Sequence, residues 1–128
     1  DIASTASGGE LSRLMLSVKS MIGQKNLLPT IIFDEIDNGV SGEVAARVGT
    51  ILKKMGEHMQ VIAITHLPQI AARGESHFRV FKNETGTLTS THIRQLNHQE
   101  RTVEIAGMIS GETVSEAALQ TANILLNN

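Results

Sequence analysis

The sequence predicts an α/β fold with a parallel sheet core, a β-hairpin and two C-terminal helices. Two short apolar runs, Ile31 to Phe33 and Val61 to Ile64, suit strands that are covered on both faces. An amphipathic stretch from Ser41 to Gly56 lies between them. Strand, helix and strand together make a βαβ unit of the usual length of roughly 30 residues or more. The two strands should therefore be parallel, with a right-handed crossover.

An earlier helix is predicted to begin at a capping box and to continue to about Gly23. In this box, Ser7 can accept a hydrogen bond from the amide of Glu10, whose side chain can reach back to the amide of Ser7. Gly8 and Gly9 leave the first-turn amides bare of side chains. Unsatisfied amides at a helix N-terminus suit a phosphate group, so this turn is either a phosphate site or a plain helix cap.

Polar side chains follow both strands of the predicted βαβ unit. Asp34 and Glu35 come directly after the first strand, and His66 follows the second. Parallel strands deliver such residues to the carboxyl edge of the sheet, where α/β folds place ligands. One carboxylate can hold a divalent cation while the other activates a water. The alternatives are that the acids begin a solvated turn and that His66 is structural or solvated.

The remainder of the chain is predicted to pack around this unit. A short helical segment covers 67–70, and a hairpin runs from 77 to 95 with a four- or five-residue loop at about 83–86. Two helices follow, at 100–109 and 114–126, the second with a capping box at 113–116. The other histidines show no paired metal-ligand spacing, and we expect them at the surface: His58, His77, His92 and His98.

Composition excludes several functional classes. The 128 residues carry a formal charge of −2, and the eleven basic residues are spread along the chain rather than clustered for DNA binding. Three Phe with no Trp or Tyr leave little material for base stacking. The absence of cysteine excludes disulfides and thiolate chemistry. No apolar run approaches the roughly 18 residues of a membrane span, so a cytoplasmic location without membrane contact is expected.

Three motifs occur together in a recognisable order: Ser7-Gly8-Gly9-Glu10, then Ile31 to Glu35, then Thr65-His66. This set resembles the signature motif, Walker B strand and switch histidine in the second half of an ABC-type ATPase head. The stretches 6–13, 33–42, 65–69 and 104–106 more narrowly resemble the RecN family of SMC-like bacterial proteins, which act in DNA double-strand-break repair. The resemblance covers essentially the whole chain. It implies the C-terminal lobe of a P-loop (ABC/SMC-type) ATPase head, a single partial domain over 1–128, in a nucleoid-associated protein.

The resemblance also implies a role for each motif. Asp34 would bind Mg²⁺, usually through water, and Glu35 would act as general base. His66 would sense the γ-phosphate of ATP. The signature motif would contact the γ-phosphate of ATP held by a second ATPase head in a homodimer: Ser7, Gly8, Gly9 and Glu10.

The sequence departs from the wider family in two places. Ser41 stands where many relatives carry an Asp that makes a contact across the head dimer; Asp37 could substitute for it or could cap the turn. No stretch matches the phosphate-binding loop G-x-x-x-x-G-K-[ST], and Gly23-Gln24-Lys25 is not a candidate. In this family that loop lies in an N-terminal half, separated by a coiled coil. The present chain alone should therefore hydrolyse ATP negligibly.

The family's sheet order has a further consequence. The absent loop strand would lie beside Val61 to Thr65, which leaves that strand with an open apolar edge in this chain. We expect the isolated chain to cover this edge by dimerising, by swapping elements or by bending its hairpin over it.

Two other functions remain open. One is a non-catalytic module that keeps the fold for dimerisation or docking. The other is the head of another SMC-like or ABC-type ATPase, although Leu67-Pro68-Gln69 and the hairpin with two final helices point away from it. DNA would be bound through the full-length protein rather than mainly by this segment.

Overall fold

The computed structural model describes Ser17 and residues 29–34, 36–37, 39–40, 42–85, 88–111 and 113–128. Several predicted features lie outside these residues. They are the first helix apart from Ser17, the cap at Ser41, and five predicted site residues: Ser7, Gly8, Gly9, Glu10 and Glu35.

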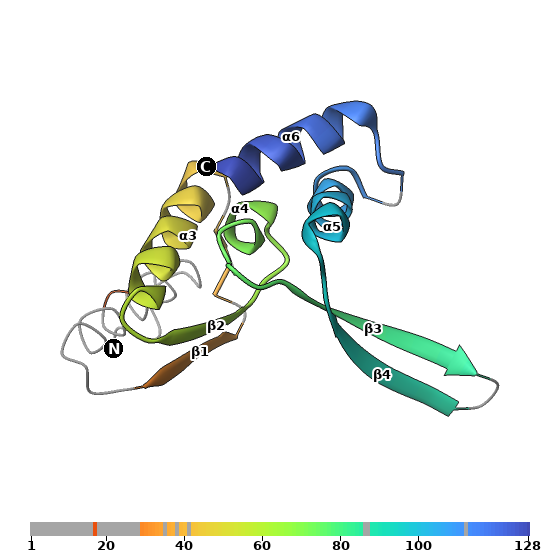
Figure 1. Cartoon of the computed structure of the whole chain (residues 1–128), viewed down its shortest axis with the longest axis horizontal. Helices are drawn as coiled ribbons and strands as arrows, with labels where there is room; N and C mark the ends of the chain where they lie inside the picture. The colour runs from red at the N-terminus through yellow and green to blue at the C-terminus, as the bar shows by residue number, and fades with distance from the viewer. Residues whose placement is uncertain are drawn as a thin grey trace.

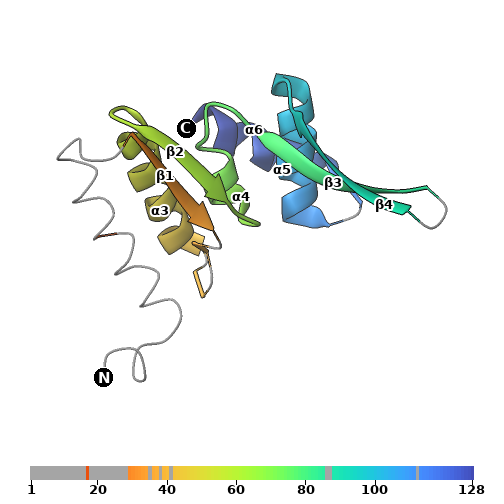
Figure 2. The ribbon, with the colours of Figure 1, turned by 90° about the horizontal axis from the view of Figure 1, so that it is seen from below.

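The predicted βαβ unit is confirmed. Strand β1 (Thr30–Asp34) is followed by helix α3 (Gly42–Gly56) and strand β2 (Gln60–Ile64). The strands pair in parallel, from Thr30 opposite Gln60 to Asp34 opposite Ile64, and both arrows point the same way in Figure 2. The two strands therefore end side by side at one edge (Figure 1).

One face of the parallel pair packs on α3. Ile31 and Phe33 point inward from β1 and are 6% and 3% exposed. The helix contributes one stripe at helical spacing to this core: Ala45, Val48, Leu52 and Met55. Val44 and Ile51 are apolar residues of the same helix but are 37% and 38% exposed. They flank the buried stripe instead of lying within it.

Helix α4 (Pro68–Ala71) lies close against α3, as the predicted short helical segment after β2. The two helices approach closely at Gly49, where a Cβ would meet the backbone oxygen of Gln69 at 2.9 Å and the Cγ of Arg73 at 2.9 Å. A larger residue at this position would force α4 away. The glycine thus sets where the chain runs after β2.

The opposite face of the parallel pair is open in the described part of the chain. Ile32, Ile62 and Ile64 are 57%, 42% and 55% exposed, so the prediction of strands covered on both faces holds for one face only. Among the described strands, β2 pairs with β1 alone. The hairpin projects away from this pair instead of bending over it (Figures 1 and 2).

The predicted hairpin is present as β3 (Phe78–Thr85) and β4 (Leu88–Gln95). The antiparallel register runs from Phe78 opposite Gln95 to Thr85 opposite Leu88, which leaves two residues between the strands. The predicted four- or five-residue loop is therefore wrong. Polar residues such as Asn83 were assigned to the loop, but they fit a strand here because both faces of a projecting ribbon meet solvent.

The two C-terminal helices are α5 (His98–Ser110) and α6 (Glu116–Asn127). With the residue after α4 they form a second small core: Ala72, Ile105, Ala106, Ala118 and Ala122. The cap of α6 is Ser115, which accepts a hydrogen bond from the amide of Ala118, instead of the predicted Thr113. Helix α5 has a capping box between Asn97 and Glu100 that was not predicted. No helix among the described residues is long and apolar enough to cross a membrane.

Charged side chains fasten α5 to the hairpin and to the segment before it. Arg79 pairs with Glu104 at 3.2 Å, and Arg94 pairs with Glu100. The Arg101 guanidinium donates to the carbonyl oxygens of Gly74 and Glu75. These contacts hold the hairpin at the angle seen in Figure 1.

The histidines follow the sequence expectation with one exception. His58, His92 and His98 are exposed, as predicted. His77 is partly buried, and the pKa of its ring is lowered by burial and by the Arg101 charge, which Glu104 only partly offsets. The prediction of a surface residue is wrong at His77 because α5 packs beside it.

Replacing Ile105 by Ala tests the second core. Ile105 is fully buried, so the change should lower the free energy of unfolding by about 2–5 kcal/mol in urea denaturation. Ile109, one turn later and 39% exposed, is the matched control, and Ile109→Ala should cost roughly 1 kcal/mol or less. Equal losses at the two positions would show that this core is packed differently.

Candidate functional site

Polar residues collect at the edge where β1 and β2 end. Asp34 closes β1 and lies opposite Ile64, the last residue of β2. Thr65 and His66 follow immediately, so Asp34 and His66 lie at the carboxyl edge of the same parallel pair. This is the edge at which α/β sheets bind ligands. Glu35 is outside the described residues.

Asp34 and His66 are both accessible. Asp34 is exposed, and its carboxylate makes no hydrogen bond or ion pair with the part of the chain that the structure describes. The His66 side chain is 73% exposed. A ligand at this edge could therefore meet a carboxylate from one strand end and an imidazole from the other.

The third polar residue of the edge, Asp37, is buried with only 2% of its surface exposed. Its Oδ2 accepts hydrogen bonds from the Thr65 hydroxyl and, at 2.8 Å, from the backbone N–H of His66. The Thr65 hydroxyl oxygen in turn accepts from the amide of Leu67 at 3.1 Å. The Nδ1 atom of His66 lies 3.1 Å from the same Oδ2. Asp37, which follows β1, thereby holds the Thr65–His66 turn that follows β2.

The geometry favours one of the two roles open to Asp37. A contact with a second head requires an exposed carboxylate, whereas this carboxylate is enclosed by its own chain. Asp37 therefore holds a turn within the chain, and that turn is the one after β2. The sequence did not reveal this link because Asp37 and Thr65 are 28 residues apart. No sequence motif pairs the two positions.

Opposing effects act on the ionisation of Asp37. Burial raises the pKa of its carboxyl, but the hydrogen bonds from Thr65 and from the His66 amide outweigh burial and leave that pKa below its ordinary value. The other oxygen, Oδ1, is buried without a hydrogen-bond partner among the described residues. The carboxylate is thus charged in the folded chain near neutral pH.

The backbone beyond His66 is fixed by α4. Pro68 and Ile70 are buried, and the amides of Ile70 and Ala71 both donate to the Leu67 carbonyl. The turn that carries His66 is therefore anchored on both sides, by Asp37 before it and by α4 after it.

Asp34 could supply one ligand to Mg²⁺ at this edge. Within the described ranges no group of three or more acidic or histidine side chains could hold a metal ion alone. Mg²⁺ commonly uses one or two protein carboxylates and takes its other ligands from water and substrate phosphates. An exposed carboxylate such as Asp34 matches that donor set, with the phosphates of a nucleotide supplying further oxygens.

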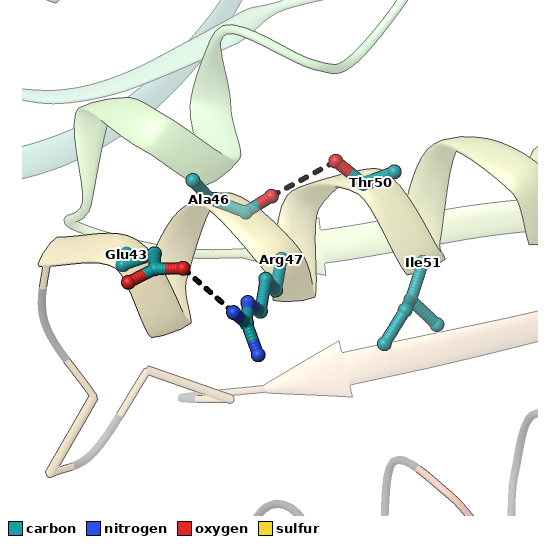
Figure 3. A pocket seen from close by; sticks show the side chains of 5 residues that line it. All are labelled: Glu43, Ala46, Arg47, Thr50 and Ile51. Atoms are coloured by element: carbon teal, nitrogen blue, oxygen red, sulfur yellow. Dashed lines mark hydrogen bonds and ion pairs between the residues drawn. The ribbon is translucent and has the colours of Figure 1, made fainter.

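A hollow on the outer side of α3 has fewer unpaired polar groups that could bind a ligand. Its lining is shown in Figure 3: Glu43, Ala46, Arg47, Thr50 and Ile51. Glu43 and Arg47 pair at 2.6 Å, and the Thr50 hydroxyl donates to the Ala46 carbonyl at 3.0 Å. These groups satisfy one another, and none of them is a predicted site residue.

Comparison with known proteins identifies the relatives of this chain. A DNA repair protein RecN from Rickettsia conorii is 48% identical over 122 residues, which are 95% of this chain and 22% of the relative. Relatives of the same name from Deinococcus radiodurans and Vibrio cholerae are 45% and 42% identical, each over 98% of the chain. The chain is a homologue of the C-terminal part of RecN. It spans about 22% of the length of these RecN relatives, and no family model matches it.

A solved structure agrees with the RecN assignment at the level of the fold. It comes from work on the ATP-driven dimerization and DNA-stimulated activation of SMC ATPases. It superposes with a TM-score of 0.62 at 20% identity and covers 86% of this chain and 65% of the solved chain. This confirms the predicted α/β fold class, which the chain shares with that SMC ATPase structure.

The charge on Asp37 makes the stability of the fold depend on pH in the acidic range. Its pKa is lower in the folded chain than in the unfolded one, so it contributes stability above its unfolded pKa, and this contribution is lost as pH falls through the folded value. Asp37→Asn should therefore flatten the loss of stability below about pH 4, measured by denaturant titration at several pH values. Glu43→Gln, at an exposed acid paired only with Arg47, should leave that loss unchanged. If the free energies of unfolding of the wild type and of Asp37→Asn fall in parallel at acidic pH, Asp37 does not cause the loss.

Proposed function

We propose that this chain is the C-terminal half of the ATPase head of a RecN-like protein of DNA double-strand-break repair. The observation that carries the proposal is the joint placement of Asp34 and His66 at one carboxyl edge, in a homologue of RecN. The SMC-type fold supports a nucleotide-dependent head. Hydrolysis would then occur where two such heads meet in a homodimer.

The residues of the edge would share the work of phosphoryl transfer, which depends mainly on positioning and electrostatics. Asp34 would hold Mg²⁺, which neutralises phosphate charge when bound. Glu35 would polarise the attacking water as general base. His66, exposed at the end of β2, would meet the γ-phosphate. The signature motif would reach ATP on the opposite head: Ser7, Gly8, Gly9 and Glu10.

The N-terminal half of the same protein would complete the head. The open face of the parallel pair exposes three isoleucines, Ile32, Ile62 and Ile64, and β2 has one partner among the described strands. The RecN relatives are several times longer than this chain, so further segments exist in them to cover such a face. A strand beside β2 and a helix on the isoleucines would supply the phosphate-binding loop that the sequence lacks.

DNA would be held mainly outside this segment. The net charge is −2, and two arginines of the hairpin, Arg79 and Arg94, are already paired with glutamates of α5. Few free positive charges remain there to neutralise phosphates. The protein would act in the cytoplasm, associated with the nucleoid.

Replacing Glu35 by Gln in the full-length protein tests the catalytic assignment. Loss of a general base should reduce ATP hydrolysis by about 10²-fold or more, while ATP binding persists. Steady-state turnover and nucleotide binding on the same sample measure the two effects.

Two further assays accompany that test. The 128-residue chain alone should show negligible turnover, because it lacks the phosphate-binding loop. Sustained hydrolysis by the chain alone would contradict a split head. Unchanged turnover of the full-length Glu35→Gln protein would instead favour a non-catalytic dimerisation or docking module.

The open face makes a separate prediction about stability. Ile64→Ala should lower the free energy of unfolding of the isolated chain by roughly 1 kcal/mol or less, since Ile64 is 55% exposed there. In the full-length protein the same change should cost about 2–5 kcal/mol, because the N-terminal half would bury the side chain. Ile31→Ala, at a residue 6% exposed in this chain, should cost the larger amount in both. A small loss in both contexts at Ile64 would mean that nothing packs on this face.

A further inference from the structure

We propose that Asp37 is a positioning residue for His66, holding the imidazole by its Nδ1 side so that Nε2 is the nitrogen presented to the γ-phosphate. This inference rests on the proposed function and adds a residue to it. No role for this acid in the reaction follows from the motifs, since Asp34 and Glu35 already account for the metal and the base.

The first support is the contrast in exposure between the two partners. The Asp37 side chain is 1% exposed, whereas the His66 side chain is 73% exposed. The same Oδ2 receives the His66 amide at 2.8 Å and lies 3.1 Å from its ring Nδ1. The buried carboxylate thus accepts a hydrogen bond from the backbone of His66 and lies within ion-pair distance of its ring.

The second support is that the surroundings of Asp37 favour its charged form. A neutral Asn or Ser can also hold a turn by accepting amide hydrogen bonds. Burial raises the pKa of the Asp37 carboxyl, but hydrogen bonds that include those from Thr65 and the His66 amide leave it below its ordinary value. The His66 ring therefore lies beside a negative charge.

Imidazole chemistry indicates what the charge does. A carboxylate beside Nδ1 favours a proton on that nitrogen, as carboxylates do for many functional histidines. When an anion reaches Nε2, the ring lies between two negative groups, and the doubly protonated form donates to both. The γ-phosphate would then meet a positively charged donor aimed by Asp37.

Nitrogen-15 NMR of ring-labelled histidine in the full-length protein tests this directly. The His66 signals are identified as those missing from the His66→Gln spectrum. We expect Nδ1 of His66 to carry a proton without nucleotide, and both ring nitrogens to carry protons with Mg²⁺ and a non-hydrolysable ATP analogue. A bare Nδ1 in either state would overturn the proposal. This readout needs no hydrolysis, so it remains decisive even if the ATPase assignment fails.

Turnover provides the second measurement. Asp37→Asn in the full-length protein should lower kcat about 10- to 100-fold, in line with the loss of a carboxylate that orients a functional histidine. The KM for ATP should change little. Glu104→Gln removes one acid from the Arg79 ion pair on α5 and is the charge-matched control, with kcat unchanged.

A double-mutant cycle separates positioning from general damage. If Asp37 acts through His66, then adding Asp37→Asn to His66→Gln should cause no further loss of kcat. Independent losses that multiply in the double variant would overturn the proposal, and so would an Asp37→Asn protein with wild-type kcat.

Discussion

The hydrogen bonds between the buried Asp37 carboxylate and the Thr65–His66 turn are the constraint on which the site depends. They join two segments that lie 28 and 29 residues apart in sequence, just beyond the ends of two paired strands. Backbone pairing alone aligns β1 with β2 but leaves the turns after them free to diverge. The carboxylate removes that freedom, and it does so at the edge where α/β folds bind ligands.

The apolar core supports this edge of the sheet. Ile31 and Phe33 pack on one stripe of α3, and Gly49 lets α4 approach the same helix, so the chain entering and leaving the His66 turn is fixed. Within the described residues, the opposite face of the strands carries exposed isoleucines. The chain spans about 22% of the length of a RecN relative that it matches.

Local patterns in the sequence were sufficient to predict the described helices and strands, apart from their exact ends, and the position of the edge. Apolar runs located both strands, helical spacing located α3, and the residues after each strand placed Asp34 and His66 together. Interactions that depend on tertiary contact were not predictable in this way. The Asp37–Thr65 hydrogen bond links distant residues, and the length of the hairpin loop depended on strand pairing that tolerates polar residues at the surface. The caps at Asn97 and Ser115 were open to prediction, because each is a preferred N-cap residue, but the predicted helix starts lay at other residues.

In the proposed function, one nucleotide meets both strand ends. A crystal structure of the full-length Glu35→Gln protein with Mg²⁺ and ATP would show whether it does. We expect the metal on the Asp34 side and the γ-phosphate within hydrogen-bond reach of His66, on the same nucleotide. ATP bound at another edge, or Asp34 and His66 turned to different sides of the molecule, would rule this arrangement out.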